Sequence, residues 1–377
     1  MAGPPLTAVV VGGGIGGLTA ALSLLQAGLR VQVYEQAAEL AEVGAGLQLS
    51  PNATRVLQHL GLGPALSRTA VLPEALESRH WQDGRLLGSY RVNGSPPQYG
   101  APHYLVYRPH LLDVLVSALP ADTIRLGWQA AGLVQDAGCA TVEFTGGRRA
   151  TADLVVAADG IHSALRAVLF GADQPAFSGT VAYRGLLPAD RVRHLRIPNT
   201  STKWWGPRPE HHLVHYHLAH GELVNVVGVV PEDWRTESWA AEGTTADFAA
   251  AFRDFHAPVP ELTAAAERVY KFAIFDRPPL PEWTAGRVTL LGDACHPMVP
   301  FMAQGAAMAV EDAAILGRCL QECAASGVAS ALRRYSAVRR QRTGRMQAGS
   351  RADTSATWGG RDWVYGFDPL TAPLAGP

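Results

Sequence analysis

The sequence predicts an α/β protein in which a Rossmann-like nucleotide-binding domain is interleaved with a strand-rich domain. Three short motifs carry this prediction: a glycine cluster after an apolar run at Ala8–Val11, and two later apolar runs that end at Asp159-Gly160 and Gly292-Asp293. Between these motifs lie long stretches of alternating polarity with many aromatic residues. Strands inserted into a doubly wound sheet give this order.

Composition sets the broad class. The 377 residues are 47% hydrophobic, which is enough for a large core and two domains. With 32 basic and 33 acidic residues, the net charge of −1 gives no general attraction to nucleic acid or anionic membranes. The 4 cysteines do not make a disulfide framework, and no segment reads as a signal peptide or membrane span. We expect a cytoplasmic monomer or homodimer without nucleic-acid or membrane partners.

The first structural unit is a strand, a glycine turn, a helix and a second strand that ends at Glu35. Gly12, Gly14 and Gly17 match G-x-G-x-x-G at the start of the helix. The first glycine permits the tight turn, the second lets a pyrophosphate approach the backbone, and the third lets helix and strand pack closely. Glu35 lies about 20 residues on, where a carboxylate binds ribose hydroxyls. This unit predicts a dinucleotide site but leaves NAD and FAD open.

The following elements alternate between the two domains. A helix is expected at 53–59, strand-like pieces with a hairpin turn at Asp83-Gly84 from 72 to 98, and a helix at 107–119. From 179 to about 275 the chain is again strand-rich, and from Arg287 the α/β pattern returns. We therefore assign 1–71, 99–178 and 276–377 to the nucleotide-binding domain, and 72–98 and 179–275 to the strand-rich domain.

The late segment from Leu290 to Leu316 reads as a buried strand, a polar turn, an irregular loop and a helix. Asp293 places a carboxylate where the strand ends. The helix is expected to begin at Gly305, where the first-turn N–H groups are free to meet a ligand. Cys319 and Cys323 lie one helical turn apart, but no second pair of ligands stands nearby at metal-binding spacing, so we expect packed helix residues and no metal.

Five histidines lie in the segment HHLVHYHLAH. On a strand, His211, His215 and His217 share one face, while His212 and Tyr216 share the other. A metal site, a solvent-exposed face and a substrate-binding strand are the three alternatives. Lys203, Arg184 and Tyr183 are candidates to bind a substrate carboxylate, with a structural ion pair as the alternative for Arg184. Trp204, Trp205 and Phe301 fit a core or a pocket wall equally well.

The three ordered motifs, with Ser163 and Arg166 after the second and GDACHPMVPFMAQG at the third, resemble the class A flavin-dependent aromatic hydroxylases, which have the para-hydroxybenzoate hydroxylase fold. Together with Lys203-Trp204-Trp205 and the late WVYGFD, they are most similar to members that hydroxylate hydroxynicotinates and then hydroxybenzoates. The resemblance implies that the nucleotide-binding domain is a Rossmann-like FAD-binding domain of the GR2 type and that the interleaved strand-rich domain binds the substrate. It implies FAD as cofactor, NADH or NADPH as reductant, and O2 and a small aromatic compound as substrates. The FAD-binding residues that it implies are Gly12, Gly14, Gly17, Glu35, Gln36, Arg108, Ala130, Asp159, Asp293, Gly305 and Ala306.

The resemblance also implies a substrate site and a reaction. The substrate would be a hydroxylated aromatic or N-heteroaromatic carboxylate, and a base would draw the proton from its ring hydroxyl. His211 and His215 are the candidate bases and Gln48 orients the substrate or flavin. Other substrate-binding candidates are Arg184, Tyr183, Ser201, Pro300 and Phe301. The chain departs from the hydroxynicotinate pattern at Gln48, Ser201 and His215. The rival hypotheses are an NAD-dependent dehydrogenase without flavin and a flavin-binding scaffold or sensor without catalysis.

Overall fold

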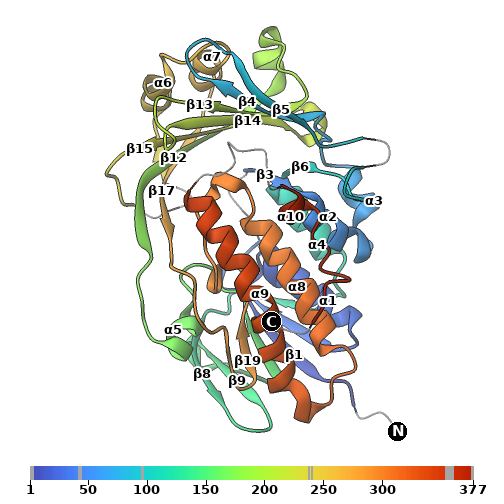
Figure 1. Cartoon of the computed structure of the whole chain (residues 1–377). Coiled ribbons are helices and arrows are strands. Elements are labelled where there is room, and N and C mark those ends of the chain that lie inside the picture. The colour runs from blue at the N-terminus through green and yellow to red at the C-terminus, as the bar shows by residue number, and fades with distance from the viewer. Residues whose placement is uncertain are drawn as a thin grey trace.

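The computed structural model describes residues 4–40, 45–94, 97–236, 238, 241–352 and 361–374. Two large sheets organise these residues, with helices packed against both (Figure 1). No helix in these ranges is both long enough and apolar enough to cross a membrane.

The first large sheet has six strands, in the order β18-β19-β11-β1-β2-β7. All neighbours are parallel except β18 and β19. The strands are β1 (Thr7–Val11), β2 (Arg30–Tyr34), β7 (Ile124–Arg125), β11 (Leu154–Ala157), β18 (Thr284–Ala285) and β19 (Val288–Leu290). Because β1, β11 and β19 are adjacent and parallel, their carboxyl ends meet at one edge. The three motifs found in the sequence therefore lie side by side in space.

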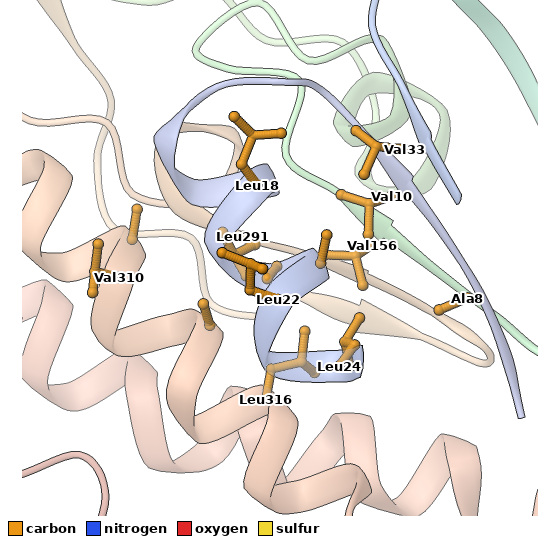
Figure 2. Close-up of a cluster of buried hydrophobic side chains, with 14 of the residues drawn as sticks. Ala8, Val10, Leu18, Leu22, Leu24, Val33, Val156, Leu291, Val310 and Leu316 are labelled. Atoms are coloured by element: carbon orange, nitrogen blue, oxygen red, sulfur yellow. The ribbon is translucent and has the colours of Figure 1, made fainter. Parts of the chain in front are cut away.

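The core of this part of the molecule lies between the sheet and helices α1 (Ile15–Gln26) and α8 (Gly305–Leu320), which pack against each other. Figure 2 shows Leu18, Leu22 and Leu24 of α1 between strand residues such as Val10 and α8 residues such as Leu316. All five are buried. Burying a side chain of this kind contributes roughly 1.5–3 kcal/mol, so the core holds the start of α1 firmly at the sheet edge.

The second large sheet has eight strands, in the order β16-β17-β12-β15-β14-β13-β4-β5. Its strands are β4 (Ala75–His80), β5 (Leu86–Arg91), β12 (Ala176–Pro188), β13 (Thr200–Trp205), β14 (His212–Leu218), β15 (Leu223–Pro231), β16 (Glu242–Gly243) and β17 (Val269–Asp276). The expected hairpin at Asp83-Gly84 is confirmed, since β4 and β5 pair antiparallel and Gly84 has φ +68°. Helices α6 (Thr245–Phe252) and α7 (Val259–Ala264) cover the face that points away from the first sheet (Figure 1).

The remaining elements connect or cover the two sheets. A small antiparallel pair, β3 (Gly46–Leu49) with β6 (Tyr104–Tyr107), lies beneath the second sheet (Figure 1). Two predicted helices are confirmed with slightly different ends, as α2 (Pro51–His59) and α4 (Arg108–Ser117). The further elements are α3 (Gly63–Ser67), β8 (Ala130–Gln135), β9 (Ala140–Phe144), β10 (Arg149–Ala152), α5 (Ala164–Phe170), α9 (Val328–Arg351) and α10 (Arg361–Tyr365).

Candidate active site

The glycine turn after β1 has the geometry that its sequence predicts. Gly12 has φ +109°, and a Cβ placed on it would lie 2.2 Å from the Ala158 carbonyl oxygen. A Cβ on Gly17 would lie 2.0 Å from the Gly12 carbonyl oxygen, so α1 can approach the turn only because Gly17 has no side chain. A Cβ on Gly14 would meet no protein atom within 4 Å. This open space beside the first turn of α1 fits a phosphate group bound by backbone N–H groups.

A cavity of about 410 Å³ opens at this turn. At its rim the Glu35 carboxylate accepts hydrogen bonds from the Gly13 N–H (2.6 Å) and the Ala37 N–H (2.8 Å). Each carboxylate oxygen keeps a lone pair for a further donor, as ribose recognition requires. The predicted cofactor-binding residues that line this cavity are Gly12, Gly14, Glu35, Gln36, Ala130 and Asp159.

Asp159 has a structural task besides lining the cavity. Its carboxylate accepts a hydrogen bond from the Ser163 hydroxyl (2.5 Å) and another from the Leu165 N–H (3.3 Å). Ser163 in turn caps α5 by accepting from the Arg166 N–H. Burial raises the pKa of Asp159, and these hydrogen bonds oppose the rise. The second motif therefore fixes the start of α5 against the cavity wall.

The other predicted cofactor-binding residues lie outside that cavity lining. Asp293 follows β19 and is accessible to solvent, although protein surrounds it closely enough that desolvation raises its pKa. The nearby charges of His296 and Arg108 oppose that rise, so Arg108 at the start of α4 lies within electrostatic reach of Asp293. Gly305 and Ala306 form the first turn of α8, which no side chain caps. Their N–H groups point from a helix N-terminus and favour negative charge on a ligand.

Sequence reasoning missed the buried network that shapes the Gly292-Asp293 turn. The Asp312 carboxylate accepts hydrogen bonds from the Gly292 N–H (3.1 Å), from His296 Nε2 (2.6 Å) and from Arg339 Nε (2.7 Å). Burial opposes ionisation of Asp312, but the charges and hydrogen bonds of His296 and Arg339 lower its pKa overall. The signal was present in the sequence as two adjacent acids, Glu311-Asp312, inside an apolar helical stretch.

One face of the eight-stranded sheet points toward β3 and the loop before α8, and we call it the inner face. The Gly46 N–H donates to Asn225 Oδ1 (3.0 Å), and Gln48 Nε2 donates to Ser201 Oγ (3.1 Å). From the loop before α8, the Phe301 ring packs edge-on against His212 at 5.2 Å. Strand pairing places the inner-face residues side by side: Arg184, Ser201, Lys203, His212, Val214, Tyr216, Asn225 and Val227.

The inner face carries positive charge around a buried histidine. Lys203 Nζ lies 3.9 Å from the centre of the Trp205 ring, and the Arg184 guanidinium lies 5.3 Å from that of Phe272. Burial, followed by the charge of Lys203, holds the pKa of His212 well below its usual range. The structure therefore brings Gln48, Ser201, Lys203, Arg184 and Phe301 together around this face, and the exposed Pro300 lies beside Phe301.

Three predicted site residues lie on the opposite, outer face under α6 and α7. The His211 ring packs against Phe252 (5.0 Å) and Phe255 (5.2 Å), and its Nε2 lies 3.1 Å from the Ala251 carbonyl oxygen. The ring of His215 stacks on Trp204, and burial lowers the pKa of His215 to about 3.

Tyr183 also belongs to the outer face. Its ring stacks on Phe248 at 5.5 Å, and its hydroxyl donates to Glu232 (3.2 Å). These placements are at odds with the expected roles of His211 and His215 as bases and of Tyr183 as a substrate ligand. As the sequence predicts, His215 and His217 share one face of the strand and His212 and Tyr216 share the other. However, it is the face with His212 and Tyr216 that points inward.

Known proteins resemble the chain over nearly its whole length. A family model described as an FAD binding domain matches residues 6–350. The chain is 42% identical over 345 residues to the 3-amino-4-hydroxybenzoate 2-monooxygenase of Streptomyces platensis, covering 91% of this chain and 86% of that protein. It is 37% identical over 378 residues to the 6-hydroxynicotinate 3-monooxygenase of Pseudomonas fluorescens, covering 98% and 96%. HpxO of Klebsiella pneumoniae, solved with FAD and uric acid, has a TM-score of 0.84 at 28% identity, covering 95% and 90%.

These similarities confirm the family, the fold and the flavin predicted from the sequence. The amino-hydroxybenzoate relative is more identical to the chain than the hydroxynicotinate relative, although over a shorter stretch. The open space at Gly14, the adjoining cavity and the uncapped start of α8 are features that fit a bound FAD. The chain therefore belongs to the FAD binding domain family and is a flavoprotein monooxygenase with FAD as its cofactor and NAD(P)H as its reductant.

Proposed function

We propose that this monooxygenase hydroxylates a small hydroxylated aromatic or N-heteroaromatic carboxylate. The observation that carries the proposal is the inner face, where Lys203 and Arg184 lie near His212 and Tyr216. Cationic side chains on a partly apolar wall suit an anionic ring. The relatives support this class, since the names of two include hydroxybenzoate and hydroxynicotinate. The position of hydroxylation and any loss of the carboxylate are left to experiment.

The inner face also offers a base. His212 Nδ1 lies 3.1 Å from the Pro209 carbonyl oxygen, which can only accept a hydrogen bond. The proton of the neutral ring therefore lies on Nδ1, and Nε2 can accept one. Because the pKa of His212 is held low, the ring is neutral at working pH. We propose that His212 Nε2 takes the proton of the substrate hydroxyl, which makes the ring more nucleophilic.

FAD, once bound and reduced by NAD(P)H, would activate O2, of which one oxygen atom goes to the substrate ring and the other to water. The chain contributes binding, orientation and exclusion of water. We assign the adenosine and pyrophosphate to the cavity at the glycine turn, and the flavin end to the region of Arg108, Asp293 and the start of α8. The N-terminus of α8 would stabilise negative charge on a ligand placed there. The residues proposed to hold FAD are Gly12, Gly14, Gly17, Glu35, Gln36, Arg108, Ala130, Asp159, Asp293, Gly305 and Ala306.

We further propose that the two predicted domains have separate roles. Residues 1–71, 99–178 and 276–377 hold FAD, and residues 72–98 and 179–275 cover the substrate. Six of the eight strands of the second sheet lie wholly within the latter two ranges, while β12 begins three residues before residue 179 and β17 ends one residue after residue 275. The chain acts as a monomer or homodimer on a small substrate with O2.

The proposal is tested with the purified protein and a panel of hydroxybenzoates, hydroxynicotinates and hydroxypicolinates, including 3-amino-4-hydroxybenzoate. We expect flavin absorbance and, for at least one compound, faster NADH or NADPH oxidation with a matching hydroxylated product. Bound FAD with no stimulation by any compound would favour a non-catalytic scaffold or sensor.

A further inference from the structure

The Gln48 side chain, on β3, bridges a histidine and a serine at one corner of the inner face. Its Nε2 donates to Ser201 Oγ at 3.1 Å, and its Oε1 lies 3.3 Å from His103 Nε2. An amide has one acceptor and one donor end, so its two ends offer a substrate opposite chemistry. Whatever fixes this amide therefore decides what the corner can bind.

His103 is itself held in place from several sides. The exposed fraction of His103 is 1%. Its backbone N–H donates to Asn93 Oδ1 (2.9 Å), and its backbone carbonyl oxygen accepts from Asn93 Nδ2 (3.0 Å). Its ring meets Tyr365 of α10 edge-on, with the ring centres 5.8 Å apart. Such an enclosed ring has little freedom to turn, so its Nε2 stays directed at Gln48.

The direction of the hydrogen bond follows from the protonation of His103. Burial, with a smaller contribution from Arg361, lowers the pKa of His103 to about 3, so the ring is neutral at working pH and carries one N–H. Nδ1 is buried and has no partner among the described residues, whereas Nε2 faces the oxygen of Gln48. The proton therefore belongs on Nε2, and His103 donates to Gln48 Oε1.

We propose that His103 is a positioning residue that holds the Gln48 amide with its NH2 group toward the substrate side. Ser201 accepts one of the two N–H hydrogens, and the other is available to a substrate. The corner then selects an anionic oxygen, either a carboxylate or a deprotonated ring hydroxyl, over a donor group. Lys203, two residues along the same face from Ser201, favours the same choice. The inference rests on the proposed function, because it assumes that the inner face binds the substrate.

The test measures substrate binding through the change in flavin absorbance, together with steady-state turnover and the ratio of product to NAD(P)H oxidised. His103→Leu removes the donor and frees the amide to rotate. We expect the Kd and KM for the best panel compound to rise by roughly three- to tenfold, as the loss of one hydrogen bond implies. The product ratio should fall, while FAD affinity and the rate of flavin reduction at saturating substrate stay unchanged. His103→Gln carries an amide donor and should recover part of the binding.

Two controls separate positioning from general damage. His217→Leu removes a histidine on the outer face, whose Nε2 lies near the Ile197 carbonyl oxygen, and should leave Kd and the product ratio unchanged. His103→Phe keeps a ring against Tyr365 and replaces His103→Leu if that variant fails to fold. The critical comparison is a double-mutant cycle with Gln48→Leu. If His103 acts through Gln48, adding His103→Leu to Gln48→Leu changes Kd no further.

The outcomes distinguish the two proposals. Additive effects in the cycle, or unchanged binding in His103→Leu, would overturn the positioning role while leaving the hydroxylase function in place. A wild-type protein that shows no absorbance change and no stimulated oxidation with any panel compound would overturn the proposed function, and this inference with it.

Discussion

A one-residue difference along β14 decides which histidines reach the substrate side. His211 and His215 pack under α6 and α7, while His212 and Tyr216 lie on the inner face. Imidazole chemistry is the same at every one of these positions. Placement alone makes His212 the proposed base and leaves His215 a buried, neutral ring.

A matched pair of substitutions tests this placement. His212→Phe should lower the rate of product formation by about 100-fold or more, as loss of a general base does, while FAD stays bound. His215→Phe should leave that rate within about twofold, because its ring stacks on Trp204 in the core of the outer face. Steady-state product analysis of both variants at equal flavin content is the measurement. If His215→Phe slowed turnover and His212→Phe did not, the base would lie on the outer face.

The glycine turn and Glu35 could be predicted from the sequence because both spacing and residue type are dictated by the ligand. Which face of β14 points inward could not be predicted from the sequence. Its residues are buried or half-buried on both faces, so polarity does not alternate in a way that marks one face as inner. His103 gave no sequence signal, because its role depends on a contact with Gln48, 55 residues away.

At the scale of elements, the N-terminus of α1 is shaped for a ligand and not for a side chain. Gly14→Ala should leave the stability of the FAD-free protein within about 1 kcal/mol, because its Cβ meets open space. The same methyl group would occupy the proposed pyrophosphate position, so FAD affinity should fall by about tenfold or more. Calorimetric titration with FAD and urea unfolding of the FAD-free protein check both statements.

Gly17→Ala is the contrasting variant. Its Cβ would lie 2.0 Å from the Gly12 carbonyl oxygen, so it should destabilise even the FAD-free protein by about 1–3 kcal/mol. Equal FAD affinity in Gly14→Ala and the wild type would place the pyrophosphate elsewhere.

Helices α8, α9 and α10 are joined through the ion pair of Arg342 with the buried Glu311. Glu311 of α8 accepts from Arg342 of α9 at Nε and Nη2, both at 2.7 Å, and Arg342 also donates to the carbonyl oxygens of Trp363 (2.6 Å) and Val364 (3.0 Å). Arg342→Leu should lower the free energy of unfolding by about 3 kcal/mol, because it leaves a buried charge partly uncompensated and releases α10.

Arg345 is the matched control for Arg342. Its guanidinium lies 4.0 Å from the centre of the Trp363 ring, a cation–π contact, so Arg345→Leu should lower stability by no more than about 1 kcal/mol. Denaturant unfolding of both variants, each saturated with FAD, measures the difference. Equal losses would show that Arg342 does not join the three helices. The adjacent acids of α8 hinted at this network, but their cationic partners lie 27 or more residues later.

For the whole molecule, buried neutral histidines make stability depend on pH. The pKa of His215 is about 3 in the folded chain and about 6.5 when unfolded, so below pH 6.5 the unfolded chain binds more protons. Stability from this group is therefore complete above pH 6.5 and declines as the pH falls toward 3.

The His215→Phe variant isolates this contribution. Between pH 7 and pH 5 the wild type should lose about 2 kcal/mol more stability than His215→Phe, as the linkage relation gives for one such group. Urea unfolding at the two pH values, at fixed FAD saturation, measures it. Parallel losses in both proteins would show that His215 is not neutral in the folded state.

The interleaved order of the elements could also be predicted from the sequence, because strand ends and turns have local signals. The way the eight-stranded sheet faces the FAD side depends on contacts between distant segments, such as Gly46 with Asn225 and Gln48 with Ser201. The cofactor was accordingly predictable from short motifs, whereas the substrate-binding residues needed the assembled molecule.

The most direct test of the account is to run the reaction under oxygen-18 gas with the panel compound that best stimulates NAD(P)H oxidation. We expect one oxygen-18 atom in each molecule of hydroxylated product, seen by mass spectrometry, and formation of this labelled product about 100-fold or more slower when His212 is replaced by Phe. A product whose new oxygen comes from water, or NAD(P)H oxidation that yields only peroxide with every compound, would contradict it.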